Sequence, residues 1–390
     1  KAIIPQAAGS SVGSLGGHYR YFGARVGGVN EWAGNIGWFA QNGQKVFPRL
    51  PASLPHDQYN ALAALWESER AESPIDLHKA WAHLPMKDAL AAQGMPATDF
   101  EDNLMRPAGD PYWNALPYMR ESYTSDVPAL FINSWYDFGA DMTMLQFNHF
   151  RSRSVSATAR ENQFVIMSPH PHCAFEREMA QRTLVGEYDV GDTRFDYRGA
   201  YLTWFDAWLK DDPLAHRRIK EWPRIRYYAM GRNRWQTASE WPIAATRERS
   251  LFLASAGRAN GLEGDGRLIE APAAGDLAGT DTLVYDPANP VPTRGGSLCC
   301  TGTPDAVAGA LDQRPVEVRQ DVLVYTSEAL REELEVTGDV QVILHVSSDV
   351  IDTDFTVKLV DVQPDGRALN VLDSVLRARY REGQEREVWM

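Results

Sequence analysis

The chain has 390 residues, of which 44% are hydrophobic, and a formal net charge of −13. This length predicts about two or three domains with large cores, and the composition excludes general disorder. No run of about 18 consecutive apolar residues occurs, and the acidic charge argues against nucleic acid and anionic membranes as partners.

The first five residues have the pattern of a buried strand, and a Gly/Ser-rich loop follows over residues 9–17. There is no initiator Met, no signal peptide and no polar C-terminal tail. We therefore expect sequence to be missing at both ends, so that any targeting signal would be unseen. Localisation is left open, with the cytoplasm favoured over secretion, and a homo-oligomer is not excluded.

Residues 19–125 have a helical and aromatic pattern without strand-like alternation. Helical stretches are predicted from Asn30 through Phe39, over 58–70 and over 75–84. This block is expected to be a helical cap inserted into another domain.

The pattern changes near residue 126. Strands are predicted at 127–133 and 163–167, with helices at 139–152 and 197–210. Alternating strands and helices are typical of an α/β sheet, which we assign to residues 1–18 and 126–248. Active sites in such sheets lie beyond the carboxyl ends of the strands.

After residue 248 the helical pattern largely stops. Pro/Gly-rich turns separate five predicted strands, at 249–254, 282–285, 322–325, 340–346 and 355–362. Many short strands with such turns predict a β-sandwich over 249–390.

Two polar loops each end a predicted buried strand. The first contains Asp137, and the second contains His170 and His172. A carboxylate bonded to one imidazole nitrogen fixes the tautomer, and the other nitrogen can then take a proton from a serine. Asp before His is the order found in α/β-hydrolases. The alternatives are that Asp137 only caps a helix and that the histidine is an ordinary loop residue.

Two other motifs in the sequence could carry chemistry. Residues 9–13 match G-x-S-x-G, but the glycines that follow suit no helix, so Ser11 is interpreted as a loop residue rather than the nucleophile. His170, His172 and Cys173 crowd three metal donors into four residues without a second paired motif, so neither a metal nor another cofactor is predicted.

At these residues the sequence resembles the cocaine-esterase-like hydrolases. That group includes α-amino acid ester hydrolases, glutaryl-type cephalosporin acylases and X-prolyl dipeptidyl peptidases. LFINSWYD at 130–137 resembles the family's strand ending in the triad acid. SPHPH at 168–172 resembles its G-P-W-x-H segment, with Ser and His where the family has Gly and Trp. The strongest resemblance lies in DPANPVP, DQRP, RQDVL, DTDF, KLVDV and PDGR, which begin at residues 286, 312, 319, 352, 358 and 364.

The resemblance implies an α/β-hydrolase core without its N-terminal part, a helical cap and a truncated C-terminal jelly-roll. It also implies a serine hydrolase in which Asp137 orients His172 and the serine lies upstream of residue 1. The substrate would be a small ester, amide or short peptide, cleaved through an acyl-enzyme. Trp38 and Phe138 are candidate pocket walls, with plain core packing as the alternative. A carbohydrate-binding protein with a vestigial core, and a Cys- or metal-dependent enzyme, are the other functions considered.

Overall fold

The computed structural model describes most of the chain. The described residues are 1–8, 13, 15, 25–43, 50–51, 53–71, 75–95, 98–107, 110–116, 118–299, 301, 303 and 306–381, without the side chains of 65–71. Ser11, the serine interpreted above as a loop residue, lies outside them.

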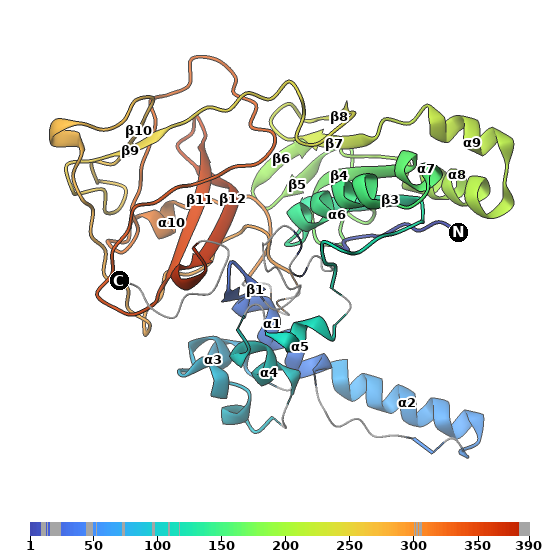
Figure 1. The fold of residues 1–390 in the computed structure, drawn as a ribbon. Coiled ribbons are helices and arrows are strands. Elements are labelled where there is room, and N and C mark those ends of the chain that lie inside the picture. The colour runs from blue at the N-terminus through green and yellow to red at the C-terminus, as the bar shows by residue number, and fades with distance from the viewer. Residues whose placement is uncertain are drawn as a thin grey trace.

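A four-stranded sheet forms the centre of the α/β part (Figure 1). Its strands are β3 (Ala129–Tyr136), β4 (Gln163–Pro171), β7 (Ile225–Ala229) and β8 (Arg234–Ala238), in the order β3-β4-β7-β8. The first three are parallel, and β8 runs antiparallel to β7. The helices that alternate with these strands are α6 (Ala140–Arg153), α7 (Ala157–Glu161), α8 (Tyr197–Lys210) and α9 (Pro213–Lys220). The predicted alternation of strands and helices is confirmed.

Both faces of the sheet are buried, as expected for parallel strands. Along β3, Phe131 faces a cluster that includes Phe147 of α6, whereas Leu130 and Ile132 face a cluster that includes Trp204 of α8. On α8, the apolar side chains Leu202, Phe205 and Leu209 lie on the opposite face and are 65%, 37% and 64% exposed. Burial of α8 therefore rests on Trp204 and its neighbours.

Residues 3–7 run parallel to β3 through the bridges Ile3 to Ala129 and Gln6 to Ile132. The predicted extended pairing is present, but burial is partial, because Ala2 and Ile4 pack against the cluster around Trp204 whereas Ile3 is 40% exposed. The bridges place this segment beside β3, on the side away from β4.

The predicted helical block lies beside the sheet, and α2 projects away from the body of the molecule (Figure 1). Its helices are α1 (Trp32–Asn42), α2 (His56–Ala71), α3 (Leu77–Ala82), α4 (Asp99–Met105) and α5 (Pro111–Asn114), with the 3-10 helices η3 (Met86–Asp88) and η4 (Ala91–Gln93). Thr98 and Glu101 form a capping box at the start of α4. A short hairpin, β1 (Arg25–Val26) and β2 (Val29–Asn30), was not predicted.

The C-terminal part contains fewer strands than predicted. It has β9 (Phe252–Ala254), β10 (Arg267–Ile269), β11 (Asp354–Val362) and β12 (Ala368–Arg377), together with α10 (Arg314–Glu317), η5 (Gly275–Leu277) and η6 (Ala378–Tyr380). The predictions at 249–254 and 355–362 correspond to β9 and β11. Segments 282–285, 322–325 and 340–346 form no strand, so those predictions were wrong.

The missing strands have a physical reason. A strand must pair its N–H and C=O groups with a neighbour. Segment 322–325 has only short pairing with residues 259–261, and Ile343 in the third segment is 71% exposed. The boundaries 1–18 with 126–248, 19–125 and 249–390 stay predictions. None of the described helices combines the length and apolar character needed to cross a membrane.

Candidate active site

The site lies where β3 and β4 end side by side. The two strands pair in register from Ala129 with Gln163 to Ser134 with Ser168, and then shift, so that Tyr136 pairs with Pro171. One extra residue on β4 makes this shift a β-bulge, and such bulges re-aim side chains near active sites. As a result Asp137 and His172 leave the same edge of the sheet together.

Asp137 is 2% exposed, and both of its carboxylate oxygens are bonded. Oδ1 accepts the backbone N–H of Gly139 at 2.7 Å, just before α6 begins. Oδ2 lies 2.5 Å from Nδ1 of His172. A buried carboxylate needs such partners to offset the cost of leaving water. The orientation of this group is therefore fixed from two sides.

The His172 side chain is 18% exposed and follows the last residue of β4. An ionised carboxylate only accepts hydrogen bonds, so the facing Nδ1 carries the proton and donates it to Oδ2. The other nitrogen, Nε2, is then the basic atom of the ring. The Phe138 ring lies 5.0 Å from the imidazole ring, centre to centre, and is tilted by 45° relative to it.

His170 points into the protein rather than toward Asp137. It is fully buried, with Nδ1 3.1 Å from Ser168 Oγ and Nε2 3.3 Å from Thr193 Oγ1. Ser168 Oγ in turn lies 2.7 Å from Ser134 Oγ. Loss of water contact lowers the pKa of His170 to about 4, so the ring is neutral near pH 7.

Two hairpin strands, β5 (Thr183–Val185) and β6 (Tyr188–Gly191), close over this buried network. Thr183 Oγ1 lies 2.8 Å from Thr193 Oγ1, so both threonines belong to it. Sequence reasoning noted Ser168 only as a departure from the family segment and missed the two threonines, because no local pattern marks residues that meet only after the hairpin folds back.

The arrangement does not favour a metal or a cysteine nucleophile. His170 and His172 diverge, and among the described residues no three His, Cys, Asp or Glu side chains gather in a way that could hold a metal ion. The thiol of Cys173 is free, but burial, with the negative charge of Asp137, raises its pKa. A reactive cysteine needs the opposite shift.

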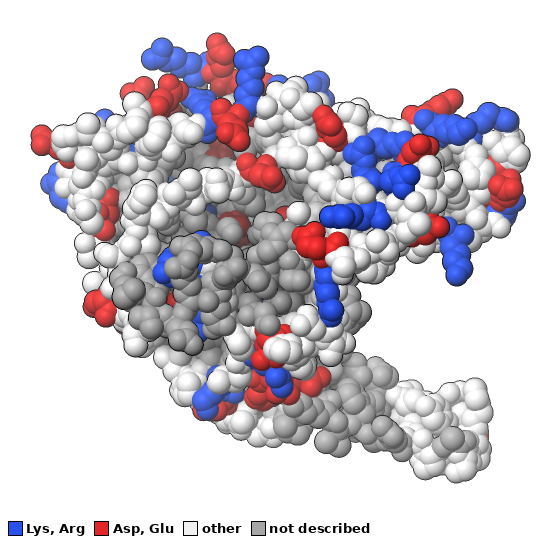
Figure 2. Space-filling view, in the orientation of Figure 1, with Lys and Arg blue, Asp and Glu red and all other residues white. Residues whose placement is uncertain are grey.

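No aromatic ring contact between described residues links Trp38 to the site of Asp137 and His172. It lies on α1, is 51% exposed, and makes no aromatic contact with a described residue. Figure 2 shows acidic and basic side chains interspersed over the visible face, so this face carries no large field of one sign.

Comparison with known proteins agrees with this picture. A family model described as the X-Pro dipeptidyl-peptidase C-terminal non-catalytic domain matches residues 218–390. The cocaine esterase of Rhodococcus sp. is 33% identical over 278 residues, which is 71% of this chain and 45% of that protein. The chain belongs to the cocaine-esterase-like and X-prolyl dipeptidyl peptidase-like family. The resemblance seen in the sequence is confirmed.

Further members and structures are more distant. Proteins of Mycobacterium bovis and Mycobacterium tuberculosis that carry the name serine esterase are 26% identical over 322 residues, or 78% of this chain and 45% of theirs. The crystal structure of an aminopeptidase from a marine sediment archaeon (Thaumarchaeota) has a TM-score of 0.58 at 22% identity, over 100% of this chain and 60% of that one. That likeness concerns the fold alone. The chain spans less than half the length of the curated relatives.

Within this family, the part that the family model describes as non-catalytic begins after both residues of the site. Asp137 and His172 precede residue 218, where the match starts. The matched region includes β7 and β8, however, so it contributes two strands to the same sheet as β3 and β4.

Proposed function

We propose that the protein is a serine hydrolase that cleaves an ester or amide through an acyl-enzyme, with Asp137 and His172 as triad acid and base. The contact of 2.5 Å between Oδ2 of Asp137 and Nδ1 of His172, at the carboxyl edge of a parallel sheet, carries this proposal. A buried carboxylate on Nδ1 leaves Nε2 as the base and stabilises the imidazolium that forms.

The chemistry follows from these two side chains. His172 Nε2 takes the proton of a serine hydroxyl as the serine oxygen attacks the substrate carbonyl. It then gives this proton to the leaving alcohol or amine, and the acyl-enzyme forms. A water molecule, deprotonated by the same nitrogen, releases the acid and restores the serine. We assign the serine to a segment outside residues 1–390, as the family register implies.

The proposal extends to architecture and substrate class. We assign residues 19–125 to a helical cap and 249–390 to a domain of jelly-roll type. The names of the relatives, cocaine esterase and serine esterase, support small esters as substrates, with amides and short peptides as the alternative classes. An aromatic wall such as Phe138 suits an apolar acyl group.

A serine-directed probe tests the proposal. The full-length protein should react with a fluorophosphonate and lose turnover of p-nitrophenyl acetate in parallel, and peptide mass spectrometry should place the label outside residues 1–390. The isolated chain should neither react nor turn over the ester, because Asp137 and His172 then have no serine to activate.

The controls separate the alternatives. A label on Ser11, with activity lost in Ser11→Ala, would place the nucleophile within the chain and overturn its assignment outside. A full-length protein that neither reacts nor hydrolyses esters or amides would sink the enzyme proposal and favour a binding protein.

A further inference from the structure

Tyr136 is the last residue of β3 and directly precedes Asp137. Its side chain is 2% exposed and belongs to a cluster that includes Leu369 and Tyr228. Its hydroxyl donates to the backbone carbonyl of Asn370, on β12, at 2.9 Å. The residue beside the candidate acid is therefore held by the C-terminal part of the chain.

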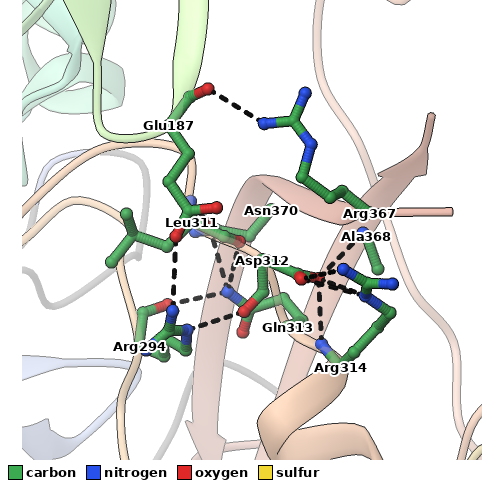
Figure 3. A network of polar contacts seen from close by, with 9 residues as sticks. All are labelled: Glu187, Arg294, Leu311, Asp312, Gln313, Arg314, Arg367, Ala368 and Asn370. Carbon is green, nitrogen blue, oxygen red and sulfur yellow. Dashed lines mark hydrogen bonds and ion pairs between the residues drawn. The ribbon is translucent and has the colours of Figure 1, made fainter. Parts of the chain in front are cut away.

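The carbonyl that receives this bond is itself fixed (Figure 3). The fully buried side chain of Asn370 accepts the N–H of Leu311 at 2.8 Å and Nε2 of Gln313 at 3.2 Å. The backbone N–H of Asn370 donates to Leu311 in return, at 3.3 Å. Because several hydrogen bonds converge on the buried Asn370, they fix its position.

A second group of contacts anchors the start of β12. Asp312 accepts the N–H of Ala368 at 3.0 Å and is paired with the guanidinium of Arg314, 2.6 Å from Nη2 (Figure 3). The Arg314 guanidinium lowers the pKa of Asp312 to about 2, so the pair is charged at neutral pH. The loop before α10 and the first residues of β12 thus form one rigid support.

Within the sheet, the last residues of β3 pair with β4 less regularly than the residues before them. The last rung pairs Tyr136 with Pro171, and proline has no N–H to donate to a ladder. Beyond it, the Asp137 backbone makes local bonds, from its N–H to Ser134 and from the N–H of Ala140 to its carbonyl. The hydroxyl of Tyr136 supplies an anchor at the point where the sheet loses one.

We propose that Tyr136 is a positioning residue that couples Asp137 to the C-terminal part, so that a region matching a model described as non-catalytic sets the orientation of the triad acid. This inference rests on the proposed function, because Asp137 is the acid of that function. Asp137 must stay within hydrogen-bond reach of His172, and a small misplacement of a catalytic group costs much of the rate.

Tyr228 offers a matched control. It is 1% exposed, belongs to the same cluster as Tyr136, and its hydroxyl also donates to backbone carbonyls, those of Val190 and Asp192. Phenylalanine at either position removes one buried hydroxyl and its hydrogen bond, so both variants should lose a similar amount of stability. The two tyrosines differ in that Tyr136 directly precedes Asp137 in the chain, whereas Tyr228 lies on β7.

The experiment compares Tyr136→Phe and Tyr228→Phe in the full-length protein. We expect Tyr136→Phe to lower kcat about 10-fold with little change in KM, because about 1.4 kcal/mol of transition-state stabilisation corresponds to that factor. Hydrogen–deuterium exchange of residues 134–140, which include the Gly139 N–H bonded to Asp137, should become faster. Tyr228→Phe should lose similar stability and change neither readout.

The outcomes separate this inference from the proposed function. Equal kcat and equal exchange in the two variants, in an enzyme that still depends on Asp137 and His172, would overturn the positioning role alone. Turnover that does not depend on Asp137 would overturn both.

Discussion

Replacing His172 by alanine in the full-length protein is expected to lower turnover by about 10⁴-fold, because the base that accepts the serine proton is lost. Asp137→Asn should cost a similar factor for a different reason. The asparagine oxygen can still accept the Gly139 N–H, so the loop keeps its shape. Its amide N–H would donate to Nδ1 of His172, however, so the ring would carry its own proton on Nε2. In that tautomer Nε2 could not accept the proton of the serine.

Two other histidines serve as controls. His170→Ala should lower turnover far less, since His170 bonds Ser168 and Thr193 rather than Asp137. His216→Ala removes another histidine paired with an aspartate, 3.2 Å from Asp211 on the surface of the molecule, and should leave turnover unchanged. Rates of p-nitrophenyl ester hydrolysis measure all four variants. If His170→Ala were more damaging than His172→Ala, the assignment of the base would be wrong.

The pairing of Asp137 with His172 could be predicted because each follows a buried apolar run. Apolar runs are local signals, and the carboxyl ends of adjacent parallel strands meet at one edge. The apolar runs do not predict which of His170 and His172 bonds Asp137 and which is buried. His170 is buried whereas His172 bonds Asp137, and the register shift between β3 and β4 that lies beside them exists only once the two strands are paired.

Long-range contacts set the remaining limit. Tyr136 and Asn370 are 234 residues apart in sequence, and no periodicity links them. The apolar segment 340–346 has residues that favour strands, yet a strand forms only where a partner meets it. For Trp38, an aromatic residue in a helical pattern does not show whether its side chain faces the core or the solvent, and in the structure it is 51% exposed.

The buried imidazole of His170 should make the protein sensitive to acid. Burial lowers its pKa to about 4 in the folded protein, against 6.5 for a histidine in contact with water. Above pH 6.5 the ring is neutral in both states and has no effect on the pH dependence. As the pH falls from 6.5 to 4, the unfolded chain binds a proton that the folded protein does not, so the free energy of unfolding decreases by about 1.4 kcal/mol per pH unit.

Over the whole window this histidine should therefore cost about 3 kcal/mol of stability. Urea unfolding, followed by tryptophan fluorescence between pH 7 and 4, measures the effect. In His170→Gln the amide can still bond Ser168 and Thr193 but does not titrate, so the decrease below pH 6.5 should be shallower by up to that amount. Ser168→Ala is the matched control, because it removes a hydrogen bond of the ring, costing about 1 kcal/mol at every pH, but keeps the imidazole. Its stability should fall with pH as steeply as that of the wild type. The same steepness in His170→Gln would mean that the buried ring is not the acid-sensitive group.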